Sequence, residues 1–148
     1  MRKLLIACAV AALAAAGCYG STEPSYRPGD ASQLVQAVTR RGVTVAATVS
    51  GDSACPADAS LTNNALHLTV SDPTGGMPRD AYVYVFREKT WDASRAQIDQ
   101  CQAEYAAAHP DQAVNRLDIP IYRVLGAGWS PALTEVLTAA VTEASHSG

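Results

Sequence analysis

The first eighteen residues constrain this chain most, because they indicate which part of it can contribute to a fold. Arg2 and Lys3 precede an unbroken run of thirteen apolar or small residues, 4–16. A cationic start, a short apolar stretch and a small-residue end are typical of an export signal. As a helix, the run would rise about 20 Å, which is short of the roughly 30 Å hydrocarbon core of a bilayer. We therefore expect residues 1–17 to be a cleaved signal peptide and not a membrane-spanning helix.

The signal ends on Ala15-Ala16-Gly17-Cys18. This ending resembles the lipobox of bacterial lipoproteins, in which the cysteine becomes the lipidated first residue of the mature protein. Ala15 departs from the family pattern, which usually has Leu at that position. The resemblance implies lipidation at Cys18, with two or three acyl chains that would hold the protein stably on the extracytoplasmic side of a bacterial membrane. The alternative is an ordinary secretory signal, cut near Ala16 or Gly17, that leaves Cys18 unmodified.

Charge and length narrow the class of the mature protein. Residues 18–148 are enough for one domain with a hydrophobic core. Without Arg2 and Lys3, nine Lys and Arg side chains remain against 14 Asp and Glu, a formal charge of −5. Nucleic-acid recognition begins with a basic face, so we expect no nucleic-acid partner. The motifs also indicate no cofactor.

The mature chain divides into two parts by composition. Residues 18–29 contain the cysteine and a polar stretch with two prolines and two glycines. Such a stretch buries too little apolar surface to order itself, and it predicts a flexible tether. Residues 30–148 carry the periodic patterns expected of a single globular domain.

Helix and strand signals alternate along this domain. Asp30 is typical of an N-cap and Gly42 of a C-terminal stop, which predicts a first helix between them. Apolar and β-branched alternation predicts strands at 43–49, 66–70, 81–86 and 121–125, of which 81–86 is apolar on both faces and should be central. A second helix is expected from Thr90 or Asp92 to about His109. The last begins at Ser130-Pro131, as N-cap and first helical position.

These elements predict an α+β fold in the order α-β-β-β-α-β-α. The first strands should pair as a hairpin or meander. The step from 81 to 125 should be a right-handed crossover that joins parallel strands. We expect a small mixed four-stranded sheet with three helices packed mainly on one face.

Two cysteines remain once Cys8 is removed with the leader and Cys18 is assigned to the lipid. Cys55, in the loop 50–64, and Cys101, on the long helix, would meet in a compartment that permits disulfides. The alternatives are two free thiols, or a metal site completed by His67 and His109. Zinc sites normally show closely spaced ligand pairs, which are absent from this sequence. We therefore predict a Cys55–Cys101 disulfide and no metal site.

No catalytic motif stands out in the sequence. It contains no G-x-S-x-G elbow, no H-E-x-x-H and no phosphate-binding glycine loop, so no catalytic residue is assigned. His67 lies on the polar side of its strand, where a solvated histidine is the ordinary case. Four aromatic residues could form a binding surface at one end of the sheet, although core packing is the favoured interpretation: Tyr82, Tyr84, Tyr122 and Trp129.

The element order, with a Gly turn and Trp129 leading into the last helix, resembles the small α/β-type envelope lipoproteins of high-GC bacteria. That resemblance implies no particular activity. The leading hypothesis is a membrane-tethered, non-enzymatic module that binds an envelope protein, an envelope polymer or a small molecule. The alternatives are a small envelope enzyme whose site forms only in three dimensions, and a structural subunit of an envelope complex.

Overall fold

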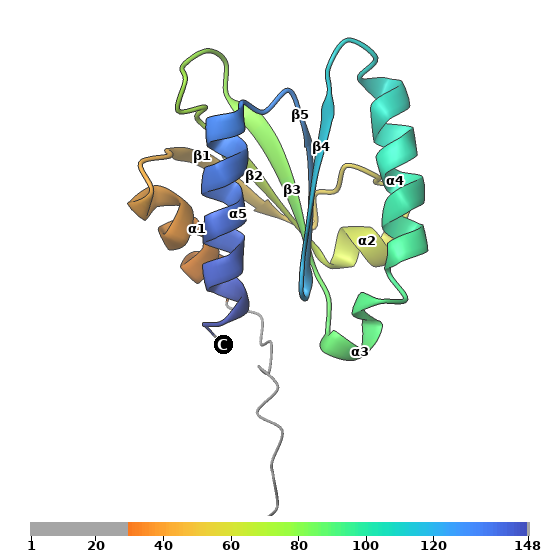
Figure 1. The fold of residues 1–148 in the computed structure, drawn as a ribbon. Helices are drawn as coiled ribbons and strands as arrows, with labels where there is room; N and C mark the ends of the chain where they lie inside the picture. Colours follow the sequence, from red (N-terminus) through yellow and green to blue (C-terminus); the bar gives the residue numbers. More distant parts are fainter. Residues whose placement is uncertain (1–29, 148) are drawn as a thin grey trace, which may run out of the picture.

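A computed structural model describes residues 30–147 (Figure 1). The expected signal peptide 1–17, the lipidation site Cys18 and the tether up to residue 29 lie outside the described residues. The fold is α+β, as expected from the sequence. In chain order the elements are α1 (Ala31–Arg40), β1 (Val45–Ser50), α2 (Ala59–Asn63), β2 (Ala65–Val70), β3 (Arg79–Val85), α3 (Glu88–Trp91), α4 (Arg95–Ala108), β4 (Val114–Ile119), β5 (Tyr122–Ala127) and α5 (Pro131–Ser145).

The sheet has five strands in the order β1-β2-β3-β5-β4, and every neighbouring pair is antiparallel. The expectation of a mixed four-stranded sheet was therefore wrong in detail. The extra strand is β4, which forms a hairpin with β5 and reverses the chain once more before β5. For that reason β5 runs antiparallel to β3, and the predicted parallel pairing of 81–86 with 121–125 does not occur. The strand β3 is central, as its apolar pattern predicted.

The sequence signal of β4 is weak because its charged residues interrupt the apolar pattern. Only Leu117 and Ile119 alternate with a polar residue, and Arg116 and Asp118 occupy the other face. Charges are common on edge strands, where they oppose further strand addition. A pattern search for half-buried strands misses such a segment.

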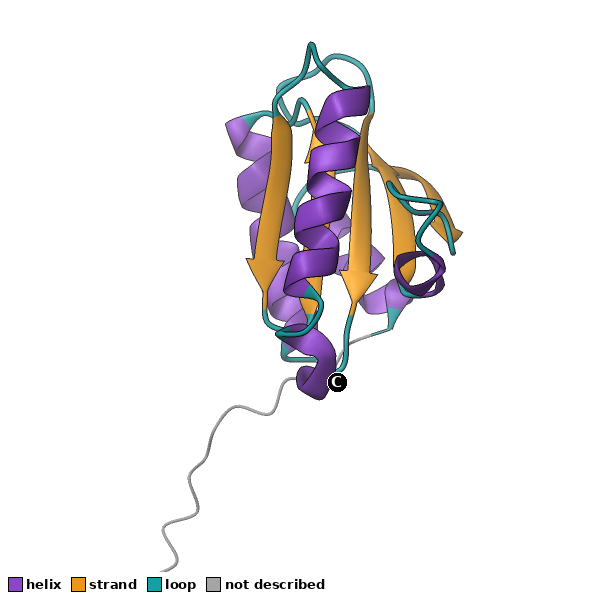
Figure 2. Cartoon of the chain, turned by 90° about the vertical axis from the view of Figure 1, so that its right-hand side faces the viewer, coloured by secondary structure: helices purple, strands orange, loops and turns teal. Residues whose placement is uncertain are grey.

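Helices cover both faces of the sheet, which corrects the expectation of three helices mainly on one face. Figure 1 shows α1 and α5 together on one side and α4 with the short helices α2 and α3 on the other. The predicted loop 50–64 contains α2. The single helix expected from Thr90 or Asp92 to His109 is two helices, α3 and α4. Figure 2, turned by 90°, shows a long helix lying along the strands.

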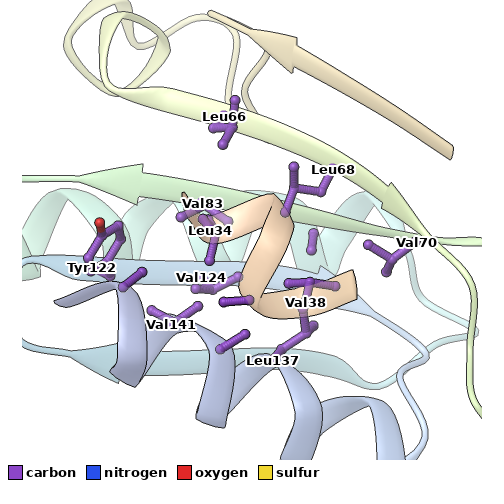
Figure 3. Close-up of a cluster of buried hydrophobic side chains, with 14 of the residues drawn as sticks. Leu34, Val38, Leu66, Leu68, Val70, Val83, Tyr122, Val124, Leu137 and Val141 are labelled. Carbon is purple, nitrogen blue, oxygen red and sulfur yellow. The ribbon is translucent and has the colours of Figure 1, made fainter. Parts of the chain in front are cut away.

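Each helical layer has its own core. Between the sheet and the α1–α5 layer lies the larger cluster, which includes Leu34, Val38, Leu68, Val124 and Leu137 (Figure 3). The second cluster lies under α2 and α4 and includes Leu61, Tyr84, Ile98, Leu125 and the two described cysteines. Because β3 and β5 contribute side chains to both clusters, the middle of the sheet is buried on both faces.

The predicted starts of the first and last helices are confirmed. The Asp30 carboxylate accepts a hydrogen bond from the backbone N–H of Gln33 at 2.8 Å. The Ser130 hydroxyl accepts one from the N–H of Leu133 at 3.1 Å, and Pro131 occupies the first turn. Both contacts satisfy N–H groups that a helix terminus leaves without an intrahelical partner.

Candidate functional site

The predicted disulfide between Cys55 and Cys101 is present, and it fastens the loop after β1 to α4. Both cysteines are buried. The phenol oxygen of Tyr84 lies beneath this loop, 3.1 Å from the Ser53 hydroxyl, and accepts a hydrogen bond from the N–H of Ala54. The bridge and the phenol together hold the loop against the sheet, which fixes the residues at its start.

The four aromatic residues proposed as a binding surface do not come together. Tyr84 is fully buried in the core under α4. Tyr122 and Trp129 belong to the core on the opposite face of the sheet, under α1 and α5. Tyr82 is partly exposed on the α4 side. Of the four, it is therefore the residue that contributes to an accessible site.

Tyr82 belongs to a group of polar side chains that we call the His67 cluster, made of Asp52, His67, Asp80 and Tyr82. Alternation along β2 places His67 on the face opposite Leu66 and Leu68, and the register pairs His67 with Tyr82 of β3. Asp80 lies two residues before Tyr82 and so shares its face. Asp52 comes from the loop that follows β1.

The two carboxylates bracket the imidazole ring. His67 Nδ1 lies 2.7 Å from Asp52 Oδ2, and His67 Nε2 lies 2.9 Å from Asp80 Oδ1. The imidazolium donates from both nitrogens, so it can satisfy both carboxylates at once, whereas a neutral ring has one proton to donate. The His67 side chain is 15% exposed, while those of Asp52 and Asp80 are 48% and 49% exposed. The carboxylates therefore face solvent and the histidine lies between them.

Aromatic rings support the cluster from α4. The His67 and Tyr82 rings are stacked with centroids 4.4 Å apart, and Tyr105 meets Tyr82 edge to face at 5.8 Å. His109 packs on Tyr105 at 4.1 Å and directs Nδ1 toward the Tyr105 carbonyl. Burial, together with the nearby Asp80 carboxylate, raises the pKa of Tyr82 to about 12. The phenol is consequently neutral at physiological pH.

The arrangement disfavours metal binding by His67. Its two ring nitrogens point to different carboxylates, so the three residues do not converge on one point. Within residues 30–147, no group of three or more His, Cys, Asp or Glu side chains is placed to hold a metal ion. The rings of Tyr82 and Tyr105 separate His67 from His109, which were considered together as possible ligands. What the cluster offers is hydrogen-bond acceptors beside a rigid aromatic stack.

A second polar group, around Arg123, is structural. The Arg123 side chain, near the start of β5, is fully buried. Its guanidinium donates to the Ser94 hydroxyl, to Asp118 and to the Trp91 carbonyl, and it stacks over the Trp91 ring at 3.7 Å. These contacts satisfy a buried charge and tie α3 and the start of α4 to the sheet. The sequence gives no sign that this arginine is buried.

A shallow hollow lies over the disulfide, but its polar side chains are already paired. It is lined by Cys55, Cys101, Asp58 and Gln97, among others. The Asp58 carboxylate caps α2 through the N–H of Leu61 and accepts a hydrogen bond from the Gln97 amide. We therefore regard the His67 cluster as the better candidate site.

Comparison with protein-family models, with curated proteins and with solved structures finds no match to this chain. Among residues 30–147, no helix is long and apolar enough to cross a membrane. The candidate site therefore depends on its own geometry.

Only the first part of the His67 cluster could be anticipated from the sequence. The polar side of strand 66–70 placed His67 on an accessible face, and Tyr82 was among the aromatic candidates. Asp52 and Asp80 lie 15 and 13 residues from His67 along the chain and form no motif with it. Their convergence depends on the register between β2 and β3 and on the path of the disulfide loop.

Proposed function

We propose that this protein is a lipid-anchored lipoprotein of the bacterial cell envelope that acts as a non-enzymatic binding module. Cys18 would carry the lipid, residues 19–29 would connect it to the fold, and the His67 cluster would contact the ligand. The observation that carries the binding role is the pair of half-exposed carboxylates held on either side of the His67 ring.

The chemistry of the cluster favours a ligand rich in hydrogen-bond donors. Each carboxylate directs one oxygen to His67 while half of its side chain stays in contact with solvent. Carboxylates accept hydrogen bonds strongly, and a rigid backing of rings limits the entropy lost on binding. We infer that the ligand is a hydroxyl-rich envelope glycan.

Lipidation at Cys18 is tested by metabolic labelling with an alkyne fatty acid in a bacterial host. We expect the unaltered chain to take up the label and to sediment with membranes. The Cys18→Ala variant should lose the label and leave the membrane fraction. Label retained on Cys18→Ala would disprove lipidation at this residue, whatever the ligand of the fold.

Ligand binding is tested by NMR: the isotope-labelled protein is titrated with soluble envelope-glycan fragments, and its amide chemical shifts are followed. We expect shifts at residues of the His67 cluster, and a weaker affinity for Asp52→Asn and Asp80→Asn. Each substitution removes a charged acceptor and nearly preserves the side-chain shape. Glu135→Gln, on the opposite face of the sheet, is the matched control and should bind as the unaltered chain does.

Two outcomes would count against the binding role. Glycan-induced shifts confined to other surfaces would place the ligand elsewhere. Chemical conversion of the glycan, lost in a His67→Asn variant, would instead favour the small envelope enzyme.

A further inference from the structure

Among residues 30–147, β1 is an edge strand of the sheet with no partner on its outer side. In the order β1-β2-β3-β5-β4 the edges are β1 and β4. The strand β4 carries Arg116 and Asp118, charges of the kind that protect an edge from pairing with another chain. The strand β1, with the sequence Val-Ala-Ala-Thr-Val-Ser, has no charge and no proline, and none of its residues is buried. No charged side chain or proline therefore opposes strand addition along β1.

The hydrogen-bonding groups that β1 offers can be assigned from its register. The N–H of Gly51 donates to the Ala65 carbonyl at 2.9 Å, so this pair is a hydrogen-bonded one. Such pairs alternate along an antiparallel ladder, which makes Val49 and Ala47 the next residues bonded to β2. Thr48 and Ser50 therefore direct their N–H and C=O groups away from β2. A bulge between Val45 and Ala47 limits this regular edge to residues 47–50.

We propose that β1 pairs with β1 of a second copy of this chain, antiparallel, about a two-fold axis at Val49. In this register Thr48 of each copy exchanges backbone hydrogen bonds with Ser50 of the other. The two Val49 side chains then face each other in a non-hydrogen-bonded pair, where side chains approach most closely. Val49 is 47% exposed, and within residues 30–147 Met77 is the only other large hydrophobic side chain exposed to this degree or more.

The sequence around the axis is self-complementary, which favours a second copy over an unrelated strand. Thr48-Val49-Ser50 presents a polar, an apolar and a polar residue in either direction, as a two-fold interface requires. Asp52 lies three residues beyond the axis, opposite Ala46 of the second copy. The two Asp52 carboxylates are then about 20 Å apart along the strands, so no like charges oppose each other. The proposal does not depend on the ligand or on lipidation.

Cross-linking through a single introduced cysteine tests the register. A Val49→Cys variant of the full chain should form a disulfide-linked dimer under mild oxidation, because a non-hydrogen-bonded antiparallel pair suits disulfide geometry. Thr48→Cys should not link to itself, since it faces Ser50 of the second copy. Thr69→Cys, one strand further in, controls for random collision, and the unaltered chain gives the background from its own cysteines.

Light scattering on the purified full chain tests the association itself. We expect twice the mass of one chain, falling to the monomer mass for Thr48→Pro, which removes an outward N–H and leaves the β2 ladder its donors. Circular dichroism checks that this variant folds. Val49→Lys, which places two like charges at the two-fold axis in an exposed position, should also give the monomer mass. If Thr48→Pro does not fold, the mass of Val49→Lys tests the association.

Three results would overturn the proposal. One is a monomeric unaltered chain whose Val49→Cys variant cross-links no faster than Thr69→Cys. Another is a dimer whose mass neither Thr48→Pro nor Val49→Lys changes, which would place the interface elsewhere. Stoichiometric copurification of another protein that is lost on Thr48→Pro would show that a different strand occupies this edge.

Discussion

At the scale of single residues, Gly126 is a position with no room for a side chain. A Cβ atom at this position would lie 2.3 Å from Cζ2 of Trp129 and 2.4 Å from the carbonyl oxygen of Asp80. The Trp129 indole covers the glycine and donates its Nε1–H to that same carbonyl at 2.9 Å. The close approach of ring and backbone therefore requires a residue without a side chain.

Gly126→Ala should consequently destabilise the fold by about 3 kcal/mol, the upper part of the range for overpacked sites. The backbone carbonyl of Asp80 cannot move aside as a flexible side chain could. Urea denaturation followed by circular dichroism measures the loss. Ala103→Ser, on the exposed surface of α4, is the control and should stay within about 0.5 kcal/mol. A Gly126→Ala variant as stable as this control would show that the ring packs differently.

At the scale of elements, the start of α5 is held by a carboxylate from a neighbouring turn at the same end of the sheet. Asp72, in the turn between β2 and β3, accepts hydrogen bonds from the hydroxyl and the backbone N–H of Ser130 at 2.7 and 3.1 Å. It also accepts two from Thr74. Burial by itself raises the pKa of the Asp72 carboxyl, but these hydrogen bonds outweigh it and lower the pKa well below its ordinary value.

Because the pKa of Asp72 is lowered, the contribution of this cap to the free energy of unfolding depends on pH, and its sign follows from the direction of the shift. As the pH falls, the unfolded chain takes up the Asp72 proton before the folded chain does. The stabilisation is therefore complete above the ordinary carboxyl pKa of 3.8 and is lost progressively as the pH falls toward the folded value. We expect Asp72→Asn to flatten the acid limb of the stability curve, measured by denaturation at a series of pH values.

Removing the hydroxyl partner tests the same cap near neutral pH. Ser130→Ala should cost about 1–2 kcal/mol, because the N–H of Leu133 loses its acceptor and Asp72 loses a donor. Thr138→Ala, which removes an exposed hydroxyl from the same helix, should cost less than about 0.5 kcal/mol. Equal stabilities for the two variants would mean that the cap contributes little.

At the scale of the whole molecule, the Cys55–Cys101 bridge joins the loop after the edge strand β1 to helix α4. The two residues are 46 apart in sequence, and closing a loop of that length stabilises a fold by about 4 kcal/mol in the chain-entropy estimate. We expect Cys55→Ser/Cys101→Ser to lose about that amount in urea denaturation. Alkylation without reductant, read by mass spectrometry, should label neither cysteine of the unaltered protein, and full labelling of both would contradict the bridge.

The same bridge links stability to the candidate site. Asp52 lies three residues before Cys55, on the segment that Tyr84 and the disulfide hold against the sheet. Loss of the bridge should therefore loosen the contact between Asp52 and His67 before the sheet itself unfolds.

Much of the local structure could be predicted from the sequence, because local signals determine it. The capping residues Asp30 and Ser130 accept hydrogen bonds from nearby backbone N–H groups, so a few adjacent residues determine where each of these helices begins. Alternation fixed the strands at 66–70 and 81–86, where one face or both are buried. The pairing of Cys55 with Cys101 was predicted by setting aside Cys8 and Cys18, which the expected export signal and lipidation would use.

The tertiary structure decided what depends on contacts distant in sequence. The sequence of an amphipathic helix does not indicate which face of a sheet the helix will cover. It could therefore not be predicted that α1 and α5 lie on one face of the sheet and α4 on the other. The charged residues of the edge strand β4 obscured its strand pattern. Because β4 was missed, β5 was predicted to run parallel to β3, whereas the two strands are antiparallel. Asp52 and Asp80 meet His67 only through strand register and the tethered loop, because hydrogen bonds between separate strands leave no periodic trace in the sequence.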